Sequence, residues 1–348
     1  MEEQGLEPPE RRDPPLRIVA MGGGTGLSAM LHGLKPFSQQ REPRVDIAAV
    51  VTVTDDGGSS GRLRRDFKVL PPGDIRNCMV ALSEDEALLS RLFQYRFASG
   101  RGLRGHSFGN LFLTALSHIT GDFAQAVKVS SEVLAIAGRI YPATAANVAL
   151  EAKLENGTTV RGETRISRSR SRIRTISLTE KCMPLSETLD AIARADLITL
   201  GPGSLFTSVV PNLLVDGIPQ AVAASPAIKA YMVNLMWQPR ESIGFTAADH
   251  VATIYEHAGL KLLDYAVLNT RPISDAMLRK YATQHSRPVE NDVERLRGLG
   301  VKVIGRDLLQ EDEKVRHDTE AVAALALELA REGRMRRIAA RPKAAEAS

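Results

Sequence analysis

The fold is decided between residues 17 and 76, where three segments follow one another: RIVAMGGGTGLSAML (17–31), VDIAAVVTVTDDGGSSGRL (45–63) and LPPGDIR (70–76). The short apolar runs at 17–21 and 46–53 are typical of strands buried in a parallel sheet. Between them, apolar side chains recur at helical spacing over 27–34, directly after a run of glycines. The stretch therefore predicts a strand, a glycine turn, a helix and a second strand, which is the beginning of an α/β fold.

The rest of the chain continues this alternation and interrupts it once. Helices are predicted at 73–98, within 105–120, and at 122–137, 186–193, 247–257, 274–284 and 319–331, and strands at 196–200, 230–235, 265–269 and 301–304. The interruption is a β-hairpin of 148–154 and 158–166 around Asn156-Gly157, with a third strand at 173–178. This order implies the α/β fold class, a Rossmann-like doubly wound, mostly parallel sheet with a small β-hairpin insertion.

We expect one folded domain, residues 16–332, between two ends of different composition. Residues 1–15 are charged and proline-rich, bury little apolar surface and are predicted to be disordered. Residues 331–348 hold six basic and two acidic side chains, a surplus equal to the net charge of +4 of the whole chain. We interpret 333–348 as a solvated basic tail. Within the domain, a β-rich excursion spans about 148–178.

Composition limits the classes of function. With 43% hydrophobic and 25% charged residues, the chain is typical of a soluble globular protein. Its two cysteines supply neither a disulfide framework nor a zinc ligand set, and no signal peptide or membrane-spanning run is evident. We therefore expect a cytoplasmic protein without membrane insertion. The low aromatic content and the basic charge confined to one end argue against a nucleic-acid partner.

Two glycine turns are candidate phosphate sites. Gly22, Gly23, Gly24, Thr25 and Gly26 link the first strand to its helix, so backbone amides can approach a ligand at a helix N-terminus. The turn lacks both the Walker lysine and the third glycine of the dinucleotide fingerprint, which argues against a redox cofactor and against an NAD-dependent oxidoreductase. The second turn, LGPGSLFTS at 200–208, offers Gly201, Gly203 and Ser204.

The segment DDGGSSG at 55–61 combines carboxylates with a glycine-serine loop. Asp55 and Asp56 end a strand, where a carboxylate can bind Mg²⁺ or a ribose hydroxyl. Ser59 and Ser60, among three glycines, offer hydroxyls and amides suited to phosphate oxygens. The alternative is an aspartate cap on a tight turn.

Further polar residues lie where loops are predicted to enter helices. Arg62 and Arg76 are candidate phosphate ligands, and Asp74 and Asn77 lie beside Arg76. His106 and Asn110 lie in GHSFGN at 105–110, where the histidine has either a structural or a ligand role. Asn234, at a strand end, is a candidate for contacting a base or a sugar.

One motif has no clear place in this site. The run RISRSRSRIR at 165–174 alternates arginine with serine and isoleucine, next to the predicted third strand of the insertion. We interpret it as an exposed strand face or hairpin tip, and the alternative is a surface for an acidic partner or a polyphosphate.

Several ordered motifs together resemble one family. These are MGGGTGLS, TDDGGSSGRLR, LPPGDIRNC, LFQYRF, GHSFGNLFLTAL, TGDF, LGPGSLFTSVVPNLL, NLMWQP and FTAADHV, spread over about residues 17–287. The set is similar to the YvcK proteins, the gluconeogenesis factors of the CofD-like superfamily. The resemblance implies a Rossmann-like fold, a bacterial cytoplasmic protein, and binding of nucleotide sugars such as UDP-N-acetylglucosamine. It also implies a role in cell shape and cell-wall precursor supply during growth on gluconeogenic carbon sources.

The enzymatic branch of this superfamily, 2-phospho-L-lactate transferase, moves a phospholactyl group from a guanosine diphosphate carrier to a deazaflavin, with Mg²⁺ held by aspartates. The first glycine turn maps to Gly22–Gly26 and the acidic strand end to Asp55 and Asp56. The chain departs from that branch around both motifs, and in NLMWQPRES it places Trp237 and Arg240 at the expected rim. The leading hypothesis is a regulatory nucleotide-sugar-binding protein that forms a homo-oligomer and contacts a regulatory protein partner. The alternative is a Mg²⁺-dependent transferase of the phospholactyl type.

Overall fold

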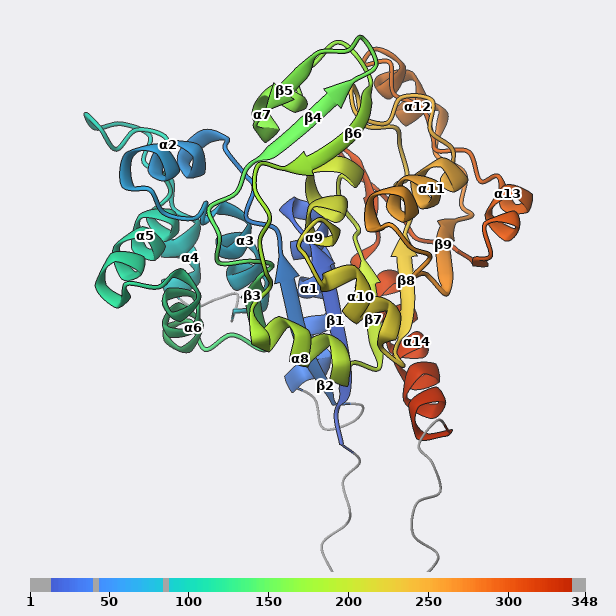
Figure 1. The fold of residues 1–348 in the computed structure, drawn as a ribbon, viewed down its shortest axis with the longest axis horizontal. Helices are drawn as coiled ribbons and strands as arrows, with labels where there is room; N and C mark the ends of the chain where they lie inside the picture. The colour runs from blue at the N-terminus through green and yellow to red at the C-terminus, as the bar shows by residue number, and fades with distance from the viewer. Residues whose placement is uncertain (1–13, 40–43, 84–87, 340–348) are drawn as a thin grey trace, which may run out of the picture.

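The structure, a computed structural model, describes residues 14–39, 44–83 and 88–339 (Figure 1). Its central sheet has seven parallel strands in the order β3-β2-β1-β7-β8-β9-β10. The strands are β1 Leu16–Gly22, β2 Val45–Val51, β3 Arg139–Pro142, β7 Leu197–Leu200, β8 Ile228–Met232, β9 Tyr265–Asn269 and β10 Lys302–Arg306. The α/β, doubly wound prediction is confirmed.

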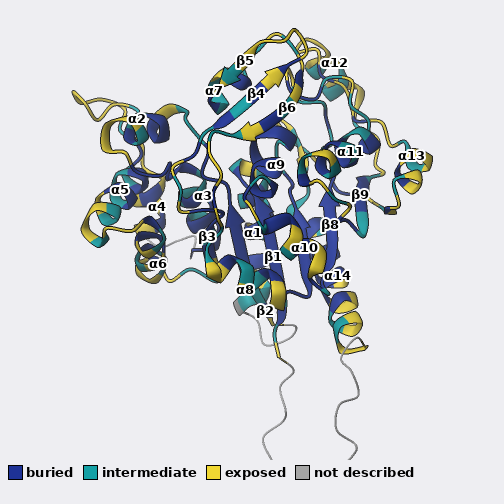
Figure 2. Cartoon of the chain, viewed as in Figure 1, coloured by how far each residue is buried: buried dark blue, intermediate teal, exposed yellow. Residues whose placement is uncertain are grey.

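Helices cover both faces of the sheet, which explains why its central strands are largely apolar and buried (Figure 2). In β1, Ile18 faces a core formed with α1 (Gly24–Gln39), α3 (Gly73–Leu82) and α14 (Thr319–Ala339). Val19, one residue on, faces a second core formed with α8 (Ser186–Arg194), α10 (Ile218–Ala224) and α11 (Ala247–Ala258). A strand buried on both sides has no polar alternation.

The remaining elements lie around this frame. They are α2 Gly58–Phe67, α4 Leu88–Gln94, α5 Phe108–Thr120, α6 Phe123–Val133, α9 Val210–Leu213, α12 Asp275–Ala282, α13 Val293–Gly298, a π-helix at Leu205–Val209, and the strands β11 Leu309–Glu311 and β12 Val315–His317. The excursion is a three-stranded sheet of β4 Leu150–Leu154, β5 Thr159–Arg161 and β6 Ile173–Leu178, with the one-turn helix α7 Glu163–Ile166. In Figure 1 this insertion lies above the carboxyl ends of the central strands.

Three local predictions are corrected. The glycine-serine segment after Asp56 is not a loop, because α2 begins at Gly58 and buries Ser59, Ser60 and Gly61. The single helix predicted at 73–98 is α3 and α4, and beyond α4 the backbone of Arg96 bridges to Ser107. The second hairpin arm ends at Arg161, where the chain turns into α7. The sequence analysis also missed β3, a short strand at the sheet edge.

The basic carboxyl end differs from the predicted tail. Residues 333–339 belong to α14, and residues 340–348 and 1–13 lie outside the described part of the chain. Arg334 and Arg337 both pair with Asp196, a fully buried carboxylate, at 2.6 and 2.8 Å. The arginines that look like a solvated tail in sequence therefore anchor a helix, because their partner is about 140 residues away in the chain.

No single described helix is long and apolar enough to span a membrane. Two helical segments, 205–213 and 218–224, meet the length and composition criteria only when they are taken together, and they are bent by 78° relative to each other.

Candidate functional site

The main cavity, of about 970 Å³, opens where the sheet order reverses. From β1 the chain builds strands to one side, through β2 and β3, and then from β7 to the other. The connections after β1 and after β7 therefore leave in opposite directions, and the crevice between them is the usual ligand site of an open α/β sheet. The cavity is lined by both connections, through Gly23–Gly26 and Pro202–Ser204.

The two glycine turns are in direct contact. A Cβ on Gly26 would lie 2.3 Å from the carbonyl oxygen of Pro202, so only a glycine allows this approach. The first turn enters α1, and the second enters the π-helix, where Ser204 Oγ accepts from Thr207 N at 3.4 Å. Two helix entrances thus meet at one wall, each with backbone amides for an anion. Gly22 is the last residue of β1, and Gly201 directly follows β7. Neither glycine lines the cavity.

The predicted acidic pair lies behind this wall, and the two members differ. Asp55 Oδ1 accepts from Gly57 N at 2.7 Å, and burial raises the pKa of Asp55. Asp56 Oδ1 accepts from Thr164 N at 2.8 Å, which ties α7 of the insertion to the end of β2. Neither carboxyl lines the cavity. Asp56 therefore has a structural partner that the sequence did not reveal.

Asp74 lies under the first turn. Its carboxyl accepts from the backbone N–H of Gly24, and a Cβ on Gly23 would lie 2.7 Å from Asp74 Oδ2. Burial, followed by the charge of Asp55, raises the pKa of Asp74 to about 6. This carboxyl positions the glycine turn from below and keeps its proton up to a pH of about 6.

Arg76 and Asn77 line the cavity from α3. Arg76 Nη2 donates to Asn77 Oδ1 at 2.5 Å, while Arg76 Nε is buried with no hydrogen-bond partner among the described residues. Burial, and then the charge of Arg96, lowers the pKa of Arg76. A half-buried guanidinium that lines a cavity is suited to a phosphate.

The other polar residues predicted near α2 form a network outside the cavity lining. Ser59 Oγ lies 2.9 Å from His106 Nδ1, and Asn110 Nδ2 donates to Ser60 Oγ at 3.4 Å. Burial, followed by the charge of Arg62, lowers the pKa of His106. These five residues support α2 and α5 from behind and do not face the cavity.

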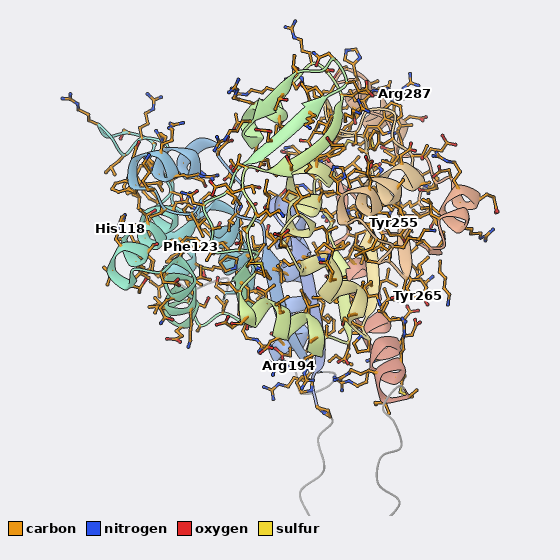
Figure 3. The ribbon with its side chains drawn as sticks, in the orientation of Figure 1. His118, Phe123, Arg194, Tyr255, Tyr265 and Arg287 are labelled. Atoms are coloured by element: carbon orange, nitrogen blue, oxygen red, sulfur yellow. The ribbon has the colours of Figure 1, made fainter. Side chains whose placement is uncertain are left out.

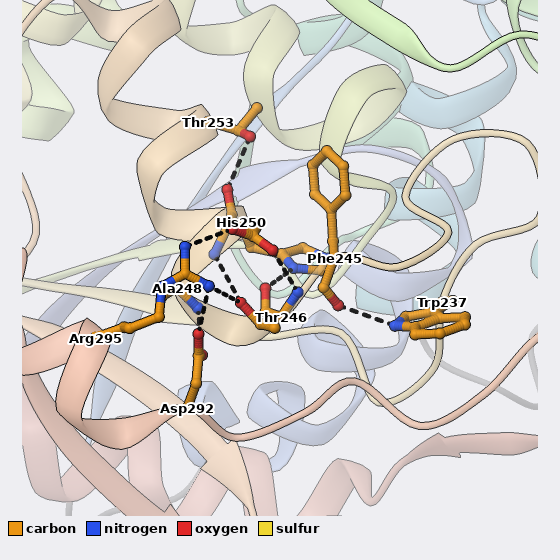
Figure 4. A network of polar contacts seen from close by, with 9 residues as sticks. Trp237, Phe245, Thr246, Ala248, His250, Thr253, Asp292 and Arg295 are labelled. Atoms are coloured by element: carbon orange, nitrogen blue, oxygen red, sulfur yellow. Dashed lines mark hydrogen bonds and ion pairs between the residues drawn. The ribbon is translucent and has the colours of Figure 1, made fainter.

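The opposite wall is the segment after β8. Asn234 lines the cavity there with Trp237 and Glu241, whereas Arg240 does not. Trp237 Nε1 donates to Phe245 O at 2.9 Å, just before Thr246 caps α11 (Figure 4).

A second set of contacts holds the end of this segment in place. The Glu241 carboxyl accepts from Ser204 Oγ of the second turn and, at 3.0 Å, from Ser167 Oγ of the insertion. Arg295 pairs with Asp249 of α11 at 2.8 Å and with Asp292 at 2.9 Å, and Asp292 in turn accepts from Ala248 N at the start of α11. Figure 4 shows Arg295 and Asp292 beside Thr246 and Ala248.

Sequence reasoning missed the residues that distant segments bring to the cavity: Glu163, Ser167, Gln238, Tyr281, Arg316 and His317. Burial lowers the pKa of His317 to about 4, and its Nε2 lies 3.2 Å from Val233 O. No local pattern marks these residues, because they reach the site from several segments that are far apart in the sequence, among them the insertion and β12. The motif RISRSRSRIR was the nearest signal, since Ser167 lies within it.

Other hollows are smaller, and one of about 310 Å³ adjoins the main cavity at Asn234 and Leu235. One of about 340 Å³ is lined by His118 and Phe123, near α5 and α6, at the left in Figure 3. Among the described residues, no group of three or more His, Cys, Asp or Glu is arranged to hold a metal ion. Mg²⁺ is often held by one or two carboxylates together with substrate phosphates, and Asp55 and Asp56 have that chemistry, but neither carboxyl lines the cavity.

Fold and cavity together define a doubly wound α/β protein with its ligand site at the topological switch point. A family model described as 2-phospho-L-lactate transferase CofD matches residues 18–309. This chain therefore belongs to the CofD family.

Two gluconeogenesis factors are similar to this chain over nearly their full length. The gluconeogenesis factor of Bacillus subtilis is 48% identical, over 91% of this chain and 98% of that protein. The gluconeogenesis factor of Listeria innocua is 41% identical, over 88% of this chain and 93% of that protein. A crystal structure of a Bacillus halodurans protein has a TM-score of 0.86 at 46% identity, and the match covers 90% of this chain and 100% of the other. The predicted resemblance to the gluconeogenesis factors is confirmed.

Proposed function

We propose that this protein binds a nucleotide sugar of the UDP-N-acetylglucosamine type and acts as a regulatory gluconeogenesis factor. The observation that carries the proposal is the pair of touching glycine turns in a cavity of about 970 Å³. That volume lies near the upper end of small-molecule sites, roughly 300–1,000 Å³, which suits an extended ligand better than a single phosphate. The similarity to proteins named gluconeogenesis factors supports the second part of the proposal, the role as a gluconeogenesis factor.

In this proposal the diphosphate lies at the two turns. Amides of Gly23–Gly26 and Gly203 face it, and the Arg76 guanidinium neutralises part of its charge. Regulation requires that the ligand bind one conformation better than another. Because Glu241 joins the second turn to the insertion, a ligand at the turn can bias how the insertion is held. A regulatory protein partner, a homo-oligomer, and a role in cell shape and cell-wall precursor supply in the cytoplasm belong to the same proposal.

Mg²⁺ would neutralise diphosphate charge where it is bound. Asp55 and Asp56 are the residues that would hold it once a carboxylate turns towards the cavity, since each now accepts a backbone N–H, from Gly57 and from Thr164. The chain's own residues hold the turns, exclude water beneath them through Asp74, and orient the ligand through Arg76 and Asn77.

The test is isothermal titration of the purified protein with UDP-N-acetylglucosamine, with Mg²⁺ and with EDTA. We expect saturable binding at one site per chain, weakened at least tenfold in Arg76→Ala, because a charge-assisted hydrogen bond is lost. An exposed arginine of α14, Arg331, supplies the control variant Arg331→Ala. If no UDP-sugar binds under either condition, the proposal is wrong.

A second candidate is a phospholactyl-type transferase. The match to the transferase family model favours it, as do the carboxyls of Asp55 and Asp74 beside the phosphate-type turns. Here the same residues would position a carrier diphosphate for attack by a deazaflavin hydroxyl. A transfer assay with saturating Mg²⁺ separates the candidates, because only the enzyme releases the nucleotide from its carrier.

A further inference from the structure

Five carboxyl groups lie in the cavity wall or directly behind it: Asp55, Asp56, Asp74, Glu163 and Glu241. Four of them accept a hydrogen bond from the protein, as described above. Glu163 is the exception, since no group among the described residues donates to its carboxyl. It lines the cavity, so its hydrogen-bonding capacity is directed at whatever occupies that space.

The position of Glu163 is set by contacts of the residues that follow it. Asp56 holds the backbone N–H of the next residue, Thr164, at 2.8 Å. Ser167, at the end of α7, donates to Glu241 at 3.0 Å. The one-turn helix that begins with Glu163 is thus fastened to the central domain at two points, and Glu163 lines the cavity. A side chain held in this way loses little further conformational freedom on binding a ligand.

The surrounding charges decide which part of a ligand fits here. Burial is the main cause that raises the pKa of Glu163. Nearby carboxyl groups raise it further, in decreasing order Asp55, Asp74, Glu241 and Asp56. A phosphate at this wall would meet a concentration of like charge. The cations of the cavity, Arg76 and Arg316, come from α3 and from β12. The wall formed by α7 is therefore suited to a neutral group rich in hydrogen-bond donors.

We propose that Glu163 recognises the sugar of the nucleotide sugar, by accepting hydrogen bonds from its hydroxyl or amide donors. The inference rests on the proposed function and assigns the sugar end of the ligand to the wall formed by the insertion. It makes the β-rich excursion part of the binding site, and Glu163 a specificity residue that separates a nucleotide sugar from the free nucleotide.

The experiment compares two probes, UDP-N-acetylglucosamine and UDP, by isothermal titration on the full chain. We expect Glu163→Ala to weaken binding of the sugar nucleotide about tenfold or more, because the hydrogen bonds between Glu163 and the sugar are lost. UDP should bind the variant as well as it binds the wild type, because in this proposal Glu163 does not contact the phosphates. Glu163→Gln, which keeps shape and an acceptor, should show a smaller loss with the sugar nucleotide.

Glu155→Ala is the matched control, since Glu155 is an exposed carboxylate on the same insertion. It should leave both affinities unchanged, and far-ultraviolet circular dichroism checks that each variant folds. An equal loss for UDP and the sugar nucleotide would overturn the inference, because Glu163 would then act on the phosphates or on a cation bound with them; repetition in EDTA identifies that cation. Unchanged affinity for the sugar nucleotide would overturn it too. If the wild type binds neither probe, the proposed function fails first, and this inference with it.

Discussion

Asp74 illustrates how a single residue is tuned by its place in the fold. In sequence it is one of several loop aspartates, and a helix cap is its simplest role. In the structure its carboxyl is buried under the first glycine turn, near the charge of Asp55, and accepts from Gly24 N–H. A buried carboxyl beside another carboxylate resists ionisation, which is why its pKa rises to about 6.

A pH dependence of stability follows from this shift. An acid whose pKa is higher in the folded state than in the unfolded state binds its proton more tightly when folded, so its contribution falls as pH rises from about 4 to about 6. Asp74→Asn keeps an acceptor for Gly24 N–H but cannot ionise. We expect the free energy of unfolding of Asp74→Asn, minus that of the wild type, to increase over this interval, by up to about 3 kcal/mol. Urea titrations of both proteins at pH 4.5 and 7.5 measure this difference in the free energy of unfolding. A difference that is the same at both pH values would contradict a raised pKa of Asp74.

At the scale of elements, the site is the contact between two strand-to-helix turns. Each turn was predicted from the sequence as a candidate phosphate site. Their contact depends on β1 and β7 being neighbours, which the pairing of Ala20 with Thr199 shows. The close approach of Gly26 to Pro202 joins the two halves of the sheet at the floor of the cavity.

Gly26→Ala tests this contact. The added methyl group would meet the Pro202 carbonyl at 2.3 Å, so the turns must separate. We expect a loss of about 1–3 kcal/mol in the free energy of unfolding, together with weaker binding of UDP-N-acetylglucosamine. Gly298→Ala is the control, because a methyl group there meets nothing within 4 Å; it should remain within about 0.5 kcal/mol of the wild type. Wild-type affinity in Gly26→Ala would show that the turns do not hold the ligand.

At the scale of the whole molecule, the two ends of the described chain meet at the edge of the sheet opposite the cavity. Asp196, just before β7, accepts from Arg17 N at 2.9 Å and pairs with Arg334 and Arg337 of α14. Arg334 also donates to the backbone of Pro14 at 2.8 Å. One buried carboxylate thus joins β1, β7 and the last helix.

Asp196→Ala should therefore separate stability from binding. Removing the carboxylate leaves two largely buried guanidinium groups without their partner, and we expect a loss of about 3 kcal/mol or more in the free energy of unfolding. Affinity for UDP-N-acetylglucosamine, measured well below the melting temperature, should change less than twofold, since the full length of β7 lies between Asp196 and the turn. Arg331→Ala, on an exposed position of the same helix, should alter neither quantity. A loss of binding in folded Asp196→Ala would contradict this view.

Some of this protein was determined by the sequence alone. Apolar runs and helical spacing predicted the parallel α/β sheet, because a strand buried on both faces must be apolar. The glycine turns were found because only a few residue types permit close backbone approach. Of the predicted site residues, Gly23–Gly26, Arg76, Asn77, Gly203, Ser204 and Asn234 do line one cavity.

The rest was decided by tertiary structure. Glu163, Arg316 and His317 reach the cavity from an insertion and a distant hairpin, and no local pattern encodes that meeting. Asp56 and Arg337 have structural partners that the sequence analysis did not predict, because those partners are far away in the chain. Without a known partner, a charged residue is predicted to be solvated. Local propensity acts over a few residues, whereas burial and charge pairing act between segments that only the folded chain brings together.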